Sequence, residues 1–543
     1  QKLANDYFSW IEGKQKPLQV TVKQPQIDKS RNIVIKGERA PAPVVCQRYL
    51  TVPMVHKDTV ALDLLSIILG SGNSSRLYME LVDTRLAVST DCSHFSLQQT
   101  GLFGVDAVLP QKGGEPEKVM AVIDQVIEKI RTKGVLGQEL EKAKNQMLRS
   151  LVEQNLEVEN KAEALGQAAI DIGDVNSVNT IIEDIKKVTT KKIQDVANKY
   201  LAPSKVCKFY VPQNIKGPFF SKNSDQETSI ITAQKSETTP EPGRGSSVRP
   251  TNYPQSAPIK KSNIKSINPQ TCTKKLDNGL TVMVVSNNEV PFITVYLGLK
   301  YGGWTDELPG TCYMAMTLLD KGTKKYSASQ LAQKLEQQAI SLSASGSIDT
   351  SSISVSCLTE RIENAMKLMA EVVLNPTFPP VEFDKEKEKL LTDLAVKQHT
   401  PEYIADNVFR RTLYGNHPYG RTATGEAEDI NKLSAGICKN WWHTYAQPEN
   451  AVIIFAGDID RDKAFRLAKK NFGRWKNPAG IKPKKDFVLP DSNKPTTIYL
   501  VNDPCSQQSQ IRIGQLGITR KMQPEYFTSR IVSDYFGFGF NSR

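Results

Sequence analysis

Residues 308–327 read LPGTCYMAMTLLDKGTKKYS. Pro309-Gly310-Thr311 opens the apolar part of this stretch, and Lys321-Gly322-Thr323 closes it. Between these flanks, three positions have the spacing that shares one face of a helix: Tyr313, Met316 and Thr317. Their phenol, thioether and hydroxyl groups make neither a good metal-ligand set nor a general base for neutral pH. We therefore expect this face to be packed and dry.

The two flanks resemble those of the insulinase-like (pitrilysin) zinc metallopeptidases. That family places an inverted motif, His-x-x-Glu-His, on a helix between Pro-Gly-Thr and Lys-Gly-Thr. Here the three motif positions hold Tyr313, Met316 and Thr317. The resemblance therefore implies a zinc helix that has lost its donors, and we predict no catalytic zinc on this segment.

The family's third ligand is a glutamate on a later helix, roughly 75 residues downstream of the motif. The matching stretch here is FDKEKEKLLTDL at 383–394, and Thr392 and Asp393 stand where the family has a Glu-Glu pair. Without imidazole partners, Asp393 is interpreted as a solvated helix residue. Cys312, which precedes Tyr313, is interpreted as core packing and not as a stray ligand.

An internal repeat is visible without any knowledge of the family. The stretch LGSGNSSR at 69–76 recurs as FGFGFNSR at 536–543, an offset of 467 residues. A shorter period of 245 residues relates 184–203 to 429–448, where Asp-Ile, Tyr and Pro recur in register. Repeats of this length are whole duplicated domains, so the chain is expected to consist of tandem half-units, two of which make one unit.

Composition is that of a large globular protein. The chain has 543 residues, 39% hydrophobic and 24% charged, with a net charge of +12 and a pI of about 9.1. Lysines alternate with acids on predicted helices such as 139–144, which favours a solvated basic surface over a nucleic-acid site. No apolar run is long enough to span a membrane. The eight cysteines include no C-x-x-C pair and do not decide the compartment.

Periodicity and turn residues predict the elements. Strands are expected within 33–55, 90–109, 280–285, 292–299, 341–358 and 452–457. Helices are expected at 58–69, 117–132 and 362–373, and a long one from 134 onward. The fold class is α+β: tandem half-units with helices packed on a mixed, mostly antiparallel sheet, as the resemblance implies.

Composition and the repeat, together with the order of half-units that the resemblance implies, predict the domain map. Residues 1–30 end a preceding half-unit, 31–220 form the second half-unit of unit one, and 221–268 are a flexible linker rich in Ser, Thr, Pro and Lys. Residues 269–485 form the first half-unit of unit two, with the degenerate motif. Residues 486–543 begin the last half-unit. By resemblance, the working zinc site is expected upstream of residue 1.

Two functions are compatible with these observations. In the first, the chain is the substrate-enclosing part of a zinc metalloendopeptidase, zinc being the cofactor of the whole protein and absent from this part. Its partners are then an unfolded peptide or small protein and the other half of its own chain. In the second, it is a non-catalytic scaffold or peptide-binding partner. Arg76, after the glycine-rich turn, is a candidate substrate contact, with a surface salt bridge as the alternative.

Overall fold

The computed structural model describes residues 2–11, 27, 29–36, 40–111, 113–214, 253–254, 271–476, 487, 497–502, 508–538 and 542. It divides into two compact units: 1–26 with 220–270, and 27–219 with 271–543. Helix α1 (Lys2–Phe8) is the one described element of the first unit. The predicted linker lies outside the described residues, apart from Tyr253 and Pro254.

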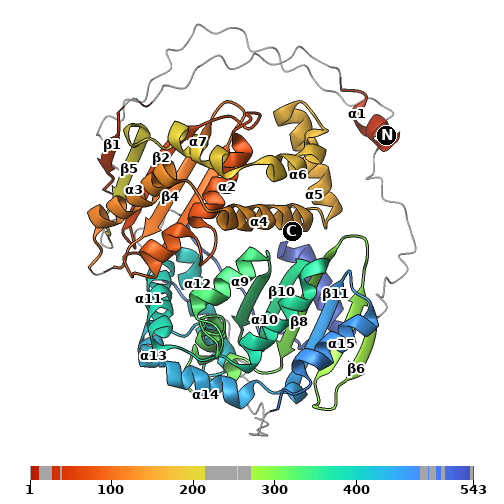
Figure 1. Ribbon diagram of the computed structural model, residues 1–543. Coiled ribbons are helices and arrows are strands. Elements are labelled where there is room, and N and C mark those ends of the chain that lie inside the picture. The colour runs from red at the N-terminus through yellow and green to blue at the C-terminus, as the bar shows by residue number, and fades with distance from the viewer. Residues whose placement is uncertain are drawn as a thin grey trace. The chain divides into compact units, whose positions relative to one another are not determined.

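The N-terminal part of the second unit is built on a mixed sheet with strand order β1–β5–β2–β4–β3 (Figure 1). β1 and β5 run parallel, and the other neighbouring pairs are antiparallel. Its strands are β1 (Arg31–Val34), β2 (Val44–Thr51), β3 (Ser89–Ser96), β4 (Gly101–Val108) and β5 (Val206–Val211).

Helices cover one face of this sheet. Val45 and Tyr49 on β2 alternate with half-exposed residues, as expected for a sheet with one buried face. They pack in one core with α2, α3 and α7, each large buried side chain contributing about 1.5–3 kcal/mol. The helices are α2 (Thr59–Gly70), η1 (Tyr78–Val82), α3 (Pro116–Lys133), α4 (Gly137–Gln154), α5 (Val158–Gln167), η2 (Ala168–Ile172), α6 (Ser177–Lys187), α7 (Thr190–Tyr200) and η3 (Pro203–Lys205).

A second mixed sheet follows, with strand order β6–β7–β11–β8–β10–β9. β7 and β11 are parallel, and the remaining neighbours are antiparallel. Its strands are β6 (Thr271–Lys275), β7 (Thr281–Ser286), β8 (Phe292–Leu299), β9 (Ser341–Gly346), β10 (Ser351–Leu358) and β11 (Ala451–Gly457).

Helices again pack on one face, because every second residue of β10 is buried, including Ile353 and Val355. They are α8 (Thr311–Thr317), α9 (Ala328–Gln337), α10 (Ile362–Leu374), α11 (Pro380–Lys397), α12 (Pro401–Tyr414), α13 (Ala427–Lys432), α14 (Ala435–Tyr445) and α15 (Arg461–Phe472). Single turns are η4 (Gly303–Thr305), η5 (Thr359–Arg361), η6 (Pro418–Gly420) and η7 (Pro448–Asn450).

The two sheets share one topology. The order β1–β5–β2–β4–β3 matches β7–β11–β8–β10–β9 strand for strand, including the single parallel pair, and β6 is an addition at one edge. Both bounds of α14 and of η7 lie 245 residues after those of α7 and η3. This is the shorter offset that the sequence repeat displays.

The predicted fold class is confirmed, with helices layered on mixed, mostly antiparallel sheets. The predicted helices at 58–69, 117–132 and 362–373 correspond to α2, α3 and α10 within a few residues. The hairpin expected at 90–109 is β3 and β4. The C-terminal described residues contain α16 (Glu525–Ser533) and η8 (Asp534–Phe538).

Candidate functional site

Helix α8 carries the three motif positions, and its N-terminus is held by several specific contacts. Gly310 precedes the helix with φ +91°, and a Cβ there would lie 2.4 Å from the carbonyl oxygen of Thr424, so only glycine fits. The carboxylate of Asp306 accepts the backbone N–H of Cys312 at 3.1 Å. Burial raises the pKa of Asp306 to about 7, although the backbone N–H groups of Cys312, Gly310 and Thr311 and the charge of Arg421 oppose the rise.

The motif positions themselves form a packed surface. Met316 is 1% exposed and belongs to the core of this half of the unit, and Tyr313 packs against the same core. The hydroxyl of Thr317 donates a hydrogen bond to the backbone carbonyl of Tyr313 at 3.0 Å, which satisfies it within the helix. Nothing on this face presents a lone pair suited to a divalent metal.

Helix α11 carries Thr392 and Asp393, the two positions at which the family has a Glu-Glu pair, and brings Asp393 near Tyr313. Thr392 is buried, and its hydroxyl donates to the carbonyl of Glu388 at 2.9 Å, whereas Asp393 is exposed. Burial raises the pKa of Tyr313, and the charges of Asp393 and Glu386 raise it further. The structure therefore places Tyr313 near Asp393, as the family pattern implies for a first and a third ligand.

The donor chemistry of this place does not fit zinc. A phenol with a raised pKa, a buried thioether and two hydroxyls bonded to carbonyls offer no imidazole or thiolate, and Asp393 alone cannot hold the ion. Cys312 is buried, and burial raises the pKa of its thiol well above the usual value. Across the described ranges, no group of three His, Cys, Asp or Glu side chains could hold a metal.

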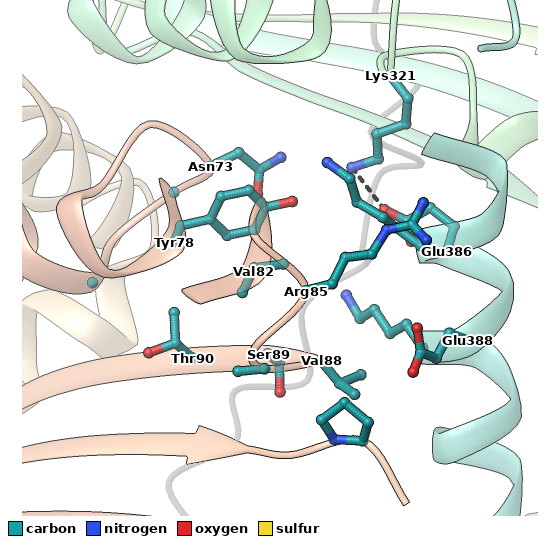
Figure 2. Close-up of a pocket in the computed structure, with 16 residues that line it drawn as sticks. Asn73, Tyr78, Val82, Arg85, Val88, Ser89, Thr90, Lys321, Glu386 and Glu388 are labelled. Atoms are coloured by element: carbon teal, nitrogen blue, oxygen red, sulfur yellow. Dashed lines mark ion pairs between the residues drawn. The ribbon is translucent and has the colours of Figure 1, made fainter. Parts of the chain in front are cut away.

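A cavity of about 200 Å³ lies next to this place in the second unit. Figure 2 shows it between the segment that carries Arg85, Val88 and Ser89 and the helix that carries Glu386 and Glu388. Its charged lining residues are Arg85, Lys321, Lys385, Lys389, Glu386 and Glu388. Lys321 is the first residue of the Lys-Gly-Thr flank, so the cavity adjoins the end of the motif segment.

Two ion pairs lie at the cavity, and the one between Lys385 and Asp83 joins its two sides. Lys321 Nζ lies 3.2 Å from Glu386, and Lys385 Nζ lies 3.0 Å from Asp83. Burial lowers the pKa of Lys321, but the carboxylates of Asp320 and Glu386 outweigh it and raise that pKa above its usual value. Lys321 is therefore a cation at any physiological pH.

A second polar contact joins the two halves of this unit near the glycine-rich turn. Lys142 and Glu336 pair at 2.9 Å with side chains only 6% and 13% exposed, and Ser74 bonds to both. Arg76, the predicted substrate contact, points elsewhere: its guanidinium makes two hydrogen bonds of 2.7 Å to Glu139. This is the salt-bridge geometry of the alternative interpretation.

The sequence analysis missed the cavity residues. Lys321 belongs to the Lys-Gly-Thr flank but is not one of the three motif positions. Arg85 has no sequence signal, because its φ of +61°, which is unusual for a residue with a side chain, is visible only in the structure. Lys385 and Lys389 were hidden in an ordinary run of charged helix residues.

Comparison with known families identifies the chain. A model described as "Peptidase M16 inactive domain" matches residues 1–147 and 432–543, and one described as "Insulinase (Peptidase family M16)" matches 281–426. Together these matches cover about three quarters of the sequence. The chain belongs to the M16, or insulinase, peptidase family, which confirms the resemblance.

Curated relatives are distant. "Non-peptidase homolog YmxG" of Helicobacter pylori is 25% identical over 48% of this chain and 60% of its own length. "Uncharacterized zinc protease YmxG" of Bacillus subtilis is 24% identical over 36% of this chain and 49% of its own length. A solved "peptidase M16 inactive domain" from Pseudomonas fluorescens is 24% identical, with a TM-score of 0.39, over 41% of this chain and 55% of that one. The chain thus spans about half the length of these proteins.

No helix in the described part of the chain is long and apolar enough to cross a membrane.

Proposed function

We propose that this chain is a non-catalytic, substrate-enclosing portion of an M16 zinc metalloendopeptidase. The observation that supports this proposal most strongly is the face of α8, where Tyr313, Met316 and Thr317 replace the donors that the insulinase motif supplies. The zinc that serves catalysis belongs in this proposal to another half-unit, expected upstream of residue 1. The chain alone then cleaves no peptide.

The sheets provide the means of holding a substrate. β3 and β9 each end a sheet, with one neighbour in the described residues, so each offers main-chain donors and acceptors to an extended peptide. One face of the first sheet is partly exposed: Arg48 pairs with Asp106 at 2.7 Å while both remain about 30% exposed, and Phe95 on β3 is 62% exposed. An unfolded peptide or small protein with free backbone groups suits such a surface.

The domain map follows as part of the same proposal. Residues 31–220 and 269–485 are two copies of one half-unit, a division supported by their shared strand order. Residues 486–543 begin a third copy. Ile531 and Val532 lie 467 positions after Leu64 and Leu65 of α2. The two α2 residues are fully buried, whereas Ile531 and Val532 are 69% and 49% exposed. A helix with that apolar face needs a sheet to cover it.

A non-catalytic scaffold or peptide-binding partner is the second candidate. The Helicobacter pylori relative is named a non-peptidase homologue, and this name and the inactive-domain match favour the second candidate. Both candidates share a peptide-holding surface and differ in whether a zinc site exists elsewhere in the protein. Metal content and peptidase activity of the protein isolated from its own cells separate them.

Peptide holding without cleavage can be tested on the chain itself. Unstructured peptides are incubated with residues 1–543, and bound peptide is recovered and weighed by mass spectrometry. The proposal expects peptide to be retained and returned uncut. Cleavage that stops when a chelator is added would contradict the non-catalytic role, and no retention of any peptide would contradict the enclosing role.

A further inference from the structure

Two of the four cations that line the cavity beside α11 take part in ion pairs. Lys321 pairs with Glu386 at 3.2 Å and with Asp320 at 3.6 Å, and Lys385 is shared between Asp83 and Glu382, both at 3.0 Å. In the part of the chain that the structure describes, Arg85 and Lys389 have no carboxylate partner. Glu388 is the remaining lining carboxylate, so two cations and one carboxylate of the lining stand outside these ion pairs.

Arg85 reaches this cavity at a conformational cost. Its φ of +61° is in the left-handed region, which costs a residue with a side chain roughly 1 kcal/mol relative to glycine. The turn is closed by hydrogen bonds from the Arg85 N–H to Val82 at 3.0 Å and from the Leu86 N–H to Leu81 at 2.8 Å. Glycine would suit this turn better, so an arginine here points to a role for its side chain.

Most N–H donors of the Arg85 guanidinium make no hydrogen bond within the described residues. Its hydrogen bond in the described residues is to the carbonyl of Val381 at 3.5 Å, the outer limit for such a bond. Figure 2 shows the side chain extending from its turn toward the helix that bears Glu386 and Glu388. The planar fork of arginine matches a carboxylate in two parallel hydrogen bonds.

Neutral donors complete the lining. Asn73 and Ser89 both line the cavity, and neither side chain makes a hydrogen bond within the described ranges. Gly72, with φ +84°, lets the backbone of the glycine-rich turn form one wall. An amide and a hydroxyl next to an arginine can bond the second oxygen of a bound acid.

We infer that this cavity binds one carboxylate of an extended peptide, from an aspartate or glutamate side chain or from the C-terminus. The inference rests on the proposed peptide-holding function and adds a substrate preference to it. A single carboxylate suits the free guanidinium fork of Arg85, whereas a doubly charged phosphate would meet about twice the repulsion from Glu388 and Glu386. The volume of about 200 Å³ accommodates a small acidic side chain and little more.

Isothermal titration calorimetry with capped peptides tests the inference. One peptide carries a single aspartate, a second has asparagine in its place, a third has asparagine with a free C-terminus, and a fourth has phosphoserine. Each is titrated into the whole chain, into Arg85→Gly, into Lys389→Gln and into the control Lys397→Gln. Lys397 ends the same helix, is exposed and does not line the cavity.

The two carboxylate peptides should bind about tenfold more tightly than the neutral one. Arg85→Gly should abolish this preference without lowering the melting temperature, since glycine relieves the strained φ; Lys389→Gln should reduce it, and Lys397→Gln should leave it unchanged. A preference for only one carboxylate peptide identifies the source of the acid. Equal affinities for charged and neutral peptides, a preference that survives Arg85→Gly, or tighter binding of phosphoserine overturns the inference while peptide holding stands. If no peptide binds, both proposals fail.

Discussion

Two buried aspartates in equivalent positions of the two halves have pKa values shifted in opposite directions. Asp58 precedes α2 in the first sheet's half, and Asp306 lies 248 residues later, the offset that also relates β2 to β8. Both carboxylates are almost fully buried. Asp58 pairs with Lys192 and with Lys199, and it accepts the hydroxyl of Tyr200 at 2.7 Å.

Asp306 forms no ion pair among the described residues, and Arg421 opposes the rise of its pKa only in part. The residues 245 positions after Lys192 and Lys199 are Ile437 and Thr444, so the second half keeps the tyrosine, as Tyr445, and loses both lysines. Burial raises the pKa of Asp58, but the hydrogen bonds from Lys192, Tyr200 and Lys199 outweigh it and lower that pKa. Burial raises the pKa of Asp306 to about 7. Partners on a distant helix, and not the fold, decide the charge of a buried acid.

The same lesson applies to the motif helix. α8 keeps the flanks, the glycine N-cap and the neighbouring α11, yet its inner face has become apolar. Introducing Tyr313→His, Met316→Glu and Thr317→His together should destabilise the chain by about 4–5 kcal/mol in chelator, because the new carboxylate replaces Met316, which is 1% exposed in the core. Urea unfolding at pH 7 measures this, and Met316→Leu, which keeps the volume, should cost less than about 1.5 kcal/mol. A triple variant as stable as the parent would show that the face is open to water.

Asp306 should make stability depend on pH. Its folded pKa of about 7 lies above the unfolded value of about 3.8, so the unfolded state loses its proton first and stability falls as pH rises through this window. Between pH 5 and pH 8 the loss amounts to about 2–3 kcal/mol. Asp306→Asn should remove that slope in urea titrations at the two pH values. An identical slope in the variant would assign the pH dependence to other groups.

Asp58 should behave in the opposite sense. Its lowered pKa stabilises the fold above about pH 4 and this contribution is lost as pH falls further. At pH 7, Asp58→Asn should cost about 2 kcal/mol, less than the full ionic term, because the heads of Lys192 and Lys199 are 36% and 56% exposed and regain water. Thermal melts at pH 7 and pH 3 compare the variant with the parent, and an equal loss at both would refute the ionic explanation.

Adding a cation to the second half sharpens the comparison. Ile437 is 38% exposed, so Ile437→Lys can place an ammonium where Lys192 stands in the first half while its stem stays partly covered. At pH 8 this variant should gain about 1 kcal/mol and should lower the pKa of Asp306. Ile437→Gln, of similar length without charge, is the control, and an equal effect of both variants would contradict the account.

The parts of this structure that could be predicted from the sequence are those that depend on local sequence patterns. The helix at 58–69 and the hairpin at 90–109 depend on neighbours within a few residues, and the structure contains both. β5 was missed, although it lies between β1 and β2. β5 pairs with strands that lie more than 150 residues earlier in the chain, and local periodicity cannot predict such a pairing.

The candidate site divides in the same way. The loss of zinc donors at Tyr313, Met316 and Thr317 is visible in the letters themselves, because a family motif specifies those positions. The cavity could not be foreseen, since Arg85 and Lys389 meet there across some 300 residues of sequence. Which of its cations lack an ion-pair partner is decided only once Lys321 and Lys385 have formed their ion pairs in the folded chain.

Zinc content tests the central claim, that α8 holds a packed face in place of a metal site, more directly than any other measurement. The chain of residues 1–543 is dialysed against zinc-containing buffer, then against metal-free buffer, and its metal is counted by mass spectrometry. The account predicts far less than one zinc per chain, unchanged by Asp393→Asn. One retained zinc per chain that Asp393→Asn releases would contradict it.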